Sequence, residues 1–306
     1  MTSNLNYDII GDIHGYAESL EQLLSKLNYT RINGVYQNPQ RKVVFLGDFI
    51  DRGPKIRETL HIVKDMVDAG HALAVMGNHE YNAVCFHTKN KHQGGYYRDH
   101  SLKEIEQHLE TLKQFKHFQT EWNDFLNWFR HLPMFLELPE FNAVHAYWNP
   151  NHISWLKVNY HPEKEGLTDE FLALCNDDGG KYNKNYECIV VDETLKGPEM
   201  PLPNDLFMID KEGVKRKECR LKWWAPSKKT WGESLMECPG SEKNQLMTDQ
   251  KYTGIFTADK PVFFGHYWLK GTPEEENKWA ICLDYSIAKH GKLVAYQFDQ
   301  KKFIWV

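Results

Sequence analysis

The chain has 306 residues, with 37 Lys and Arg against 42 Asp and Glu, which gives a formal net charge of −5. This acidic balance disfavours a nucleic-acid partner, because proteins that bind nucleic acid meet the phosphate backbone with clustered basic side chains. The longest apolar runs, such as residues 43–46 and 261–264, are far too short to cross a bilayer, so we expect no membrane partner. A chain of this length can form one large domain, and a monomer is the default expectation.

Cysteine usage and the N-terminus indicate the compartment. The six cysteines are scattered and form no C-x-x-C pair, which suits free thiols in a reducing environment better than a disulfide framework or a zinc knuckle. The first residues, MTSNLNYDII, are polar and lead directly into a strand, without the apolar segment of a signal peptide. We therefore expect a cytoplasmic protein.

Strand–loop–helix units open the chain. Residues 7–10, 43–46 and 72–76 are short, apolar and β-prone, as expected for buried strands. Residues 16–28 and 56–69 carry apolar side chains at the spacing of amphipathic helices. Strands and helices that alternate in this way predict an α/β fold with a parallel sheet and right-handed crossovers.

The rest of the chain is expected to complete a single domain, residues 1–306, with two insertions. Between about residues 86 and 130, apolar side chains recur at the spacing of an amphipathic helix, which predicts a helical insertion. Residues of about 150–235 are polar and punctuated by Gly and Pro, which predicts a loop-rich insertion. Further strands are expected at residues 134–138, 142–144 and 261–264. The last apolar segments are interpreted as an antiparallel run that closes a second sheet: residues 279–283, 292–298 and 303–306.

Polar side chains follow the predicted strands directly at their carboxyl ends. Because the carboxyl ends of parallel strands border the ligand-binding crevice of an open α/β sheet, these side chains should lie close together. Buried carboxylates and a buried guanidinium are costly without partners, and metal ions and a phosphate are suitable partners. The residues concerned are Asp12, His14, Asp48, Asp51, Arg52, Asn78, His79, His145 and His266.

This set of side chains suits phosphoryl-transfer chemistry. Mixed carboxylate, imidazole and amide ligands favour divalent Mn, Fe, Zn or Co over calcium. Two such ions, held roughly 3.5–4 Å apart by a bridging carboxylate, would activate a water as hydroxide for in-line attack on phosphorus. Arg52 could then clamp the phosphate oxygens, and His79, oriented by Asp51, could protonate the leaving group.

Each of these residues alone also has an ordinary structural interpretation. The segment from Asp48 to Arg52 could be a turn with a solvated ion pair, and Asn78 could be a turn former. A single histidine after a strand is usually a core or turn residue. That interpretation is kept for the histidines outside the strand ends: His61, His71, His87, His92, His100, His108, His117, His131, His152, His161 and His290.

Short motifs recur in the order GDIHG, GDFIDRG, GNHE, VHA and FGH. In that order they resemble the phosphoprotein phosphatase (PPP) family of calcineurin-like metallophosphoesterases, and the later motifs are similar to those of its small bacterial members. The resemblance covers residues 7–81, 132–146 and about 261–298. It implies a β-sandwich of two sheets flanked by helices, with a dimetal site at the carboxyl ends of the strands.

The resemblance also implies a role for each site residue. One metal would be held by Asp12, His14 and a bridging Asp48, and the second by Asp48, Asn78, His145 and His266. Arg52 would bind phosphate, and His79, supported by Asp51, would be the acid. The implied cofactors are two divalent metal ions, with Mn expected first and Fe, Zn, Co or Ni as alternatives.

The chain departs from the family pattern in ways that affect the substrate. Met76 precedes GNHE where many protein phosphatases carry an arginine, and Tyr147 and Trp148 follow the VHA motif where a glycine-rich continuation is usual. A second phosphate-binding cation is expected from the loop-rich insertion. Its candidates are Arg216 and Arg220, with Lys228 and Lys229 as substitutes.

Three hypotheses for the function follow from these observations, two for an enzyme and one for a non-catalytic protein. The first is a phosphomonoesterase that acts on phosphoproteins, and the second is a hydrolase of dinucleoside polyphosphates such as diadenosine tetraphosphate. The third is a non-catalytic, metal-binding regulatory protein, and a nuclease is disfavoured by the acidic charge.

Aromatic side chains could stack on a substrate ring or fill the core, with Trp223 and Trp224 as the best candidates for stacking. The aromatic residues concerned are Tyr147, Trp148, Trp155, Trp223, Trp224, Trp231, Tyr267 and Trp268.

Overall fold

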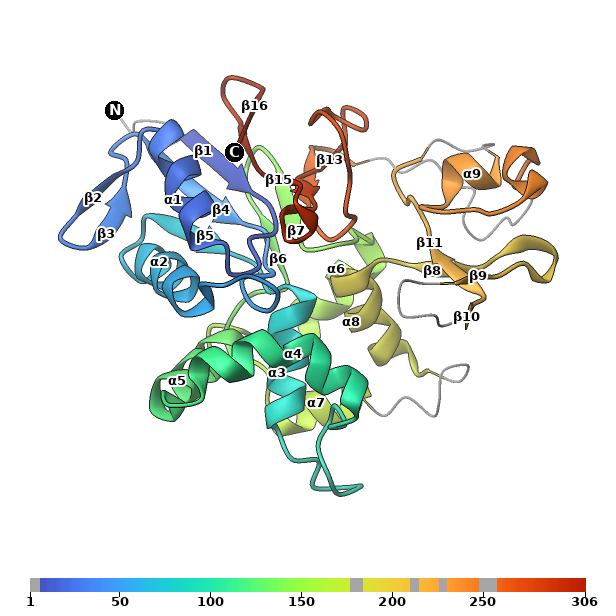
Figure 1. The fold of residues 1–306 in the computed structure, drawn as a ribbon, viewed down its shortest axis with the longest axis horizontal. Helices are drawn as coiled ribbons and strands as arrows, with labels where there is room; N and C mark the ends of the chain where they lie inside the picture. Colours follow the sequence, from blue (N-terminus) through green and yellow to red (C-terminus); the bar gives the residue numbers. More distant parts are fainter. Residues whose placement is uncertain (1–5, 177–183, 210–214, 226–229, 248–257) are drawn as a thin grey trace.

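The computed structural model describes residues 6–176, 184–209, 215–225, 230–247 and 258–306 (Figure 1). The larger of two central sheets has the strand order β14-β15-β1-β4-β5, with β16 paired to β15. Its parallel part confirms the predicted opening strands: β1 (Asn6–Ile10), β4 (Arg41–Phe45) and β5 (Ala72–Ala74). Its antiparallel part comes from the end of the chain: β14 (Asp284–Tyr285), β15 (Lys292–Gln297) and β16 (Lys302–Trp305).

The second sheet has the order β13-β12-β7-β6. Its strands are β6 (Phe135–Glu137), β7 (Asn142–Val144), β12 (Val262–Phe264) and β13 (Ala280–Cys282). The prediction for the C-terminal strands was wrong in part, because β13 runs parallel to β12, and β15 and β16 belong to the first sheet. The chain passes from one sheet to the other between Cys282 and Asp284, and apolar alternation alone does not reveal which sheet a strand joins.

Successive side chains of each strand in the first sheet point to opposite faces, so the core has one apolar layer on each side of that sheet. Ile9 and Val44 lie in the apolar cluster between the two sheets, together with Phe263 of the second sheet and Phe141, the residue before β7. Ile10, the next residue in β1, belongs instead to the cluster beneath the helices. This period of two is expected for strands that are buried on both faces, and it produces the sandwich that the sequence predicted.

Helices cover the outer face of the first sheet. The predicted amphipathic helices α1 (Ala17–Lys26) and α2 (Ile56–Asp68) are confirmed, and their buried leucines and isoleucines join the cluster beneath the helices. The helices predicted within residues 86–130 are confirmed as α4 (Leu102–Phe115) and α5 (Gln119–Arg130), which follow α3 (Asn78–His87). The hairpin β2 (Thr30–Ile32) and β3 (Val35–Gln37) was not predicted, because its largely exposed residues lack apolar alternation.

The loop-rich interpretation of residues 150–235 was wrong for their first part. Helices α6 (Pro150–Asn159), α7 (Asp169–Asn176) and α8 (Tyr186–Lys196) lie there. Pro150 begins α6 instead of breaking it, and the Asn149 side chain caps that helix by accepting from the Asn151 N–H. The segment Asp177-Asp178-Gly179-Gly180, which suggested a loop, lies outside the described residues.

Where the structure describes it, the second part of this segment consists of loops and very short elements, as predicted. Two small antiparallel sheets pair β8 (Glu199–Pro201) with β11 (Glu218–Arg220) and β9 (Met208–Ile209) with β10 (Lys215–Arg216). They project to the right of the sandwich in Figure 1, beside the short helix α9 (Trp231–Ser234). The boundaries of one domain with two insertions stay a prediction. Within the described residues, no helix is long and apolar enough to cross a membrane.

Candidate active site

The side chains that follow the strands meet around Asp48. His14 Nε2 lies 3.6 Å from Asp48 Oδ2, and His145 Nε2 lies 3.4 Å from Asp48 Oδ1. The His79 backbone N–H donates to Asp48 Oδ1 at 3.1 Å. Asp48 itself is 2% exposed. A carboxylate surrounded by imidazoles in this way is a natural bridge between two cations.

Two groups of potential metal ligands share Asp48. One consists of His14, Asp48 and His79, and the other of Asp48, His145 and His266, with the ligand atoms of each group within 4.8 Å of one another. The structure therefore groups His79 with His14, where the resemblance placed Asp12. Asp12 lies beside the second group, where its carboxylate oxygens accept from the His266 N–H at 3.1 and 3.3 Å.

Backbone carbonyls fix the tautomers of two of these histidines. His14 Nδ1 donates to Ile50 O at 2.9 Å, and His145 Nδ1 donates to Leu46 O at 2.7 Å. Each ring therefore turns an Nε2 lone pair toward Asp48, an arrangement typical of metal-ligating histidines. The buried Nε2 of His266 has no hydrogen-bond partner among the described residues. An unpaired buried imidazole nitrogen at this point fits a metal ligand.

The carboxylates of the site also fit bound cations. Burial, together with the charges of Asp284 and Asp48, raises the pKa of Asp12 well above its ordinary value. Burial and the charge of Asp48 raise the pKa of Glu80 to about 7. Anionic groups packed this closely away from water require protons or metal ions. Asn78 adds an amide oxygen, which lies 3.1 Å from His145 Nε2.

The backbone of the site is strained. His14, Asp48, Asp51, Arg52 and His266 all have positive φ angles, between 50° and 80°. Such conformations are costly for residues other than glycine and persist where the surrounding structure enforces them. Gly47 has a φ of 89°, and a Cβ there would lie 2.4 Å from the Gly77 nitrogen, so this close approach of two loops requires glycine.

Asp51 and His79 form a hydrogen-bonded pair. His79 Nδ1 donates to Asp51 Oδ2 at 2.6 Å, which leaves His79 Nε2 on the side of Asp48 at 3.9 Å. Burial opposes a charge on His79, but the carboxylates of Asp48 and Asp51 outweigh it and raise the pKa of the ring. Arg52 is exposed and makes no hydrogen bond or ion pair with the residues that the structure describes. Its guanidinium therefore remains available to an anion.

Three buried residues that support this geometry were missed by sequence reasoning. Glu80 accepts hydrogen bonds from the backbone N–H groups of Asp48, Phe49 and Gly77 at 2.8–3.0 Å, and so holds two strand-end loops together. Glu80 belongs to the GNHE motif, which could have pointed to it. The others, His108 and Thr111, contact Asp51 from α4, and the sequence treated His108 as an ordinary core residue.

Of the candidate second cations, Arg220 lies beside the site. Its guanidinium donates to the His266 carbonyl at 3.4 Å and lies over the ring of Trp268, 5.0 Å from the ring centroid. Lys289 Nζ lies 3.3 Å from the same centroid, and Trp268 is 42% exposed. Arg216 is on β10, in the β9–β10 hairpin, and Lys228 and Lys229 lie outside the described residues.

The best aromatic candidates from the sequence are core residues. Trp223 and Trp224 are 5% and 8% exposed and pack on Phe264 and Tyr267. Their burial contradicts the prediction that they stack on substrate. Among the described residues, Trp268, two residues after His266, offers an exposed ring beside the site.

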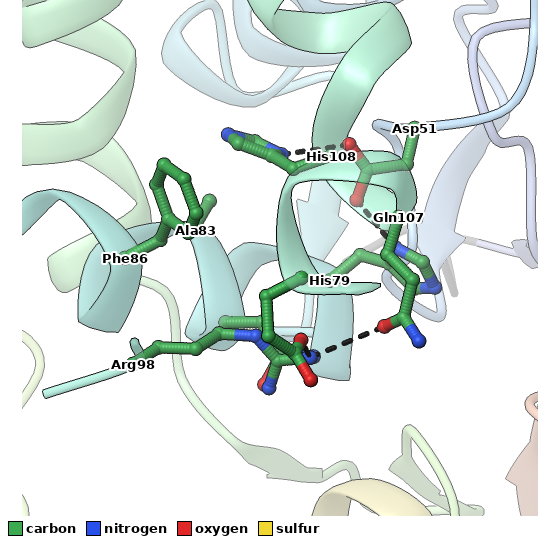
Figure 2. Close-up of a pocket in the computed structure, with 9 residues that line it drawn as sticks. Asp51, His79, Ala83, Phe86, Arg98, Gln107 and His108 are labelled. Carbon is green, nitrogen blue, oxygen red and sulfur yellow. Dashed lines mark hydrogen bonds and ion pairs between the residues drawn. The ribbon is translucent and has the colours of Figure 1, made fainter. Parts of the chain in front are cut away.

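A small pocket adjoins the Asp51–His79 pair (Figure 2). Its empty space, counting that open to solvent, is about 240 Å³. Figure 2 shows His108 and His79 hydrogen-bonded to different oxygens of the Asp51 carboxylate, with Arg98 and Gln107 on the wall of the pocket. His79 and Asp51, the predicted acid and its supporting carboxylate, therefore line this pocket.

The model of one protein family, the calcineurin-like phosphoesterases, matches residues 5–267. The chain therefore belongs to the calcineurin-like phosphoesterase family, and the predicted fold class and family resemblance are confirmed. The fold and the shared-carboxylate site together define the class of a metallophosphoesterase.

Curated bacterial relatives narrow the comparison. The chain is 32% identical over 151 residues to the asymmetrical bis(5'-nucleosyl)-tetraphosphatase PrpE of Oceanobacillus iheyensis, across 49% of this chain and 58% of the relative. It is 30% identical over 203 residues to the PrpE protein of Halalkalibacterium halodurans, across 64% of this chain and 69% of the relative. A symmetrical bis(5'-nucleosyl)-tetraphosphatase from Psychromonas ingrahamii is 32% identical over 182 residues, across 58% of each. The matches thus span between 58% and 69% of these relatives.

Proposed function

We propose that the protein is a dimetal-dependent phosphoester hydrolase that cleaves dinucleoside polyphosphates. The observation that carries the hydrolase assignment is the pair of ligand groups that share Asp48, next to the hydrogen-bonded pair of Asp51 and His79. Two divalent ions and a proton donor beside them form the machinery that in-line displacement at phosphorus requires.

The metal ligands are assigned to two sites. Asp12, His14 and Asp48 would hold one ion, and Asp48, Asn78, His145 and His266 the other. The ions, with Mn as the first choice, would supply Lewis-acid stabilisation and an activated water when bound. The backbone hydrogen bonds to His14 and His145 orient these ligands before any ion arrives.

His79 and Arg52 are assigned the steps that need no metal. The Nδ1–H of His79 is held by Asp51, so the proton for the leaving group would come from Nε2. Arg52, exposed beside Asp51, would pair two guanidinium N–H groups with two phosphate oxygens. Arg220, beside His266, is the second cation that a polyphosphate chain would meet.

The relatives and the exposed rim favour a dinucleotide over a phosphoprotein. The sequence alone put phosphoproteins first, but the relatives named above are tetraphosphatases of bis-nucleosyl substrates. Trp268 offers an exposed ring to a base, and Arg220 and Lys289 lie against that ring, where they can pair with phosphates. Relatives of the asymmetrical and of the symmetrical type both match, so the cleaved bond is left to product analysis. The expected monomer and cytoplasmic location stay predictions.

A substrate panel tests this function. The Mn²⁺-loaded protein is offered diadenosine tetraphosphate, ATP, and phosphoserine, phosphothreonine and phosphotyrosine peptides at equal concentration, with chromatographic identification of the nucleotide products. We expect preferred cleavage of the dinucleotide, and D48N serves as the inactive control. Preference for a peptide would return the assignment to a protein phosphatase. Metal binding without turnover of any phosphoester would favour the non-catalytic regulatory alternative.

A further inference from the structure

One helix of the insertion directs polar side chains into the core of the site. The buried residues of α4 are His108, Thr111 and Phe115, which lie on one face at intervals of three and four residues. An amphipathic helix normally fills such a face with apolar side chains. Here two of the three positions carry hydrogen-bonding groups, and both contact Asp51.

The contacts occupy one oxygen of the Asp51 carboxylate. His108 Nδ1 donates to Asp51 Oδ1 at 2.8 Å, and Thr111 Oγ1 donates to the same oxygen at 2.5 Å. The Asp51 backbone N–H in turn donates to Thr111 Oγ1 at 3.1 Å. The other oxygen, Oδ2, is left to His79. Rotation of the carboxylate would break bonds on both sides, so α4 fixes the direction of the oxygen that His79 uses.

The His108 ring also contacts residues on the side away from Asp51. Its Nε2 lies 3.3 Å from Nε2 of His87, and the indole N–H of Trp122 donates to that same nitrogen of His87 at 3.2 Å. His87 Nε2 is therefore an acceptor for the Trp122 indole, and it packs against the far edge of the His108 ring, whose Nδ1 donates to Asp51. In agreement, burial and the neighbouring His108 and His100 lower the pKa of His87 to about 4, which keeps its ring neutral. The chain of contacts thus runs from α5 through α3 and α4 to Asp51.

These contacts act on a strained loop. Asp51 and Arg52 have φ angles of 61° and 80°, and Gln114, further along α4, donates to Gly53 O at 3.1 Å and accepts from the Ile56 N–H at 2.6 Å. The helix therefore holds the loop that carries Asp51 on both sides of its strained residues. Conformations of this kind are maintained only by such surrounding contacts.

We propose that His108 and Thr111 are positioning residues for proton donation by His79, acting through the Asp51 carboxylate. The proposal rests on the assignment of His79 as the acid. Neither residue touches the phosphoester. Their effect is to hold Asp51 Oδ2 where it keeps the His79 ring turned with Nε2 toward the leaving group.

Leaving-group dependence tests the proposal. Phenol leaves as a much poorer anion than p-nitrophenol, so phenyl phosphate needs the acid more than p-nitrophenyl phosphate does. T111V and H108L should each lower kcat on phenyl phosphate by about tenfold more than on p-nitrophenyl phosphate, a part of the roughly 10²–10⁴-fold that a general acid contributes. T111S, which keeps the hydroxyl, should behave like the wild type. Equal losses on both esters would overturn the proposal.

A matched control and a cycle separate positioning from general damage. Thr59 is as fully buried as Thr111, but its hydroxyl donates to Lys55 O instead of contacting the site. Any loss of kcat in T59V, relative to the wild type, should therefore be equal on phenyl phosphate and p-nitrophenyl phosphate. In an H79N background, H108L should cost no further activity on phenyl phosphate, because the group through which it acts is gone. Losses that multiply in the double variant would contradict the proposal. If H108L does not fold, T111V and T111S decide alone.

A spectroscopic readout keeps the proposal separate from the proposed function. Long-range ¹H–¹⁵N spectra of the Zn²⁺-loaded protein should show a hydrogen-bonded Nδ1 proton on His79 in the wild type and T111S. That signal should be shifted or lost in T111V. An unchanged His79 ring in T111V would overturn the positioning role. If the wild type cleaves no phosphoester at all, the proposed function fails, and this spectrum still decides the role of α4.

Discussion

The α4 region and the Arg220–Trp268 rim lie against the same site and are built differently. From α4, the side chains of His108 and Thr111 are 5% and 0% exposed and bond to Asp51. At the rim, Arg220 is half-buried on the short strand β11, and Trp268 is 42% exposed. Buried, fully bonded groups hold one geometry, as proton transfer requires, whereas an exposed ring flanked by cations can meet a variable ligand. We infer that one region serves the chemistry and the other the choice of substrate.

The largest effect should come from the group that both regions depend on. D48N should lower kcat by at least about 10³-fold on every phosphoester, because a neutral amide is a poor bridge between two cations. Metal analysis of the purified variant should show fewer than the two ions expected per chain. Full activity in D48N would exclude the bridging role.

Removal of the proposed acid, His79, should separate the chemical step from metal binding. H79N should lower kcat on phenyl phosphate by about 10²–10⁴-fold and on p-nitrophenyl phosphate by much less. Its metal content should equal that of the wild type if His79 is the acid. Loss of an ion would instead identify His79 as a ligand of the group that it forms with His14 and Asp48.

Changes at the rim should affect one substrate class only. W268L should raise KM for diadenosine tetraphosphate by roughly 5–100-fold, in line with the contribution of base stacking on an aromatic ring. KM for p-nitrophenyl phosphate, which has no base, should change by less than about twofold. W305L, at a comparably exposed tryptophan on β16, is the control. Equal effects on both substrates would remove Trp268 from substrate choice.

A change in α4 outside the Asp51 contacts should act on phosphate binding. Q114L removes the hydrogen bonds to Gly53 and Ile56 that hold the loop after Arg52. Steady-state kinetics should show a KM for p-nitrophenyl phosphate raised by severalfold, because Arg52 is less well oriented, with little leaving-group dependence. A leaving-group effect as large as that of T111V would mean that Gln114 and Thr111 both act on proton donation, and would contradict a separate role for Gln114 in orienting Arg52.

The smallest effect lies outside both regions and concerns stability. Burial, with the nearby Glu274 and Glu275, raises the pKa of Glu276 to about 7, whereas the unfolded value is near 4.5. The folded chain therefore binds the extra proton, and this contribution to stability is lost as pH rises from about 4.5 to 7. E276Q keeps an acceptor for the Cys282 N–H.

Denaturant unfolding at fixed metal concentration measures this effect. The free energy of unfolding of E276Q minus that of the wild type should be larger at pH 8 than at pH 5, by on the order of 1–2 kcal/mol. A difference that is constant with pH would contradict the raised pKa. Neither pH should change the order of substrate preference.

The sequence predicted the frame of the site better than its supports. The opening strands were recognised from apolar runs that end in glycine, and the structure brings Asp12, His14, Asp48, Asn78, His145 and His266 into contact with one another. His108 was not recognised, because a histidine on an amphipathic helix looks like any core residue until its partner across 57 positions is known. Trp223 and Trp224 were misjudged for a related reason, since no local pattern says which rings of a long insertion are buried.

The division of labour between the two regions is tested most directly by one ratio, kcat/KM for diadenosine tetraphosphate over kcat/KM for phenyl phosphate. It is measured in the wild type, H108L and W268L. The ratio should rise in H108L, because phenol is the poorer leaving group and depends more on the acid. It should fall in W268L, because only the dinucleotide has a base to stack. A ratio that moves in the same direction in both variants, or in neither, would contradict the account.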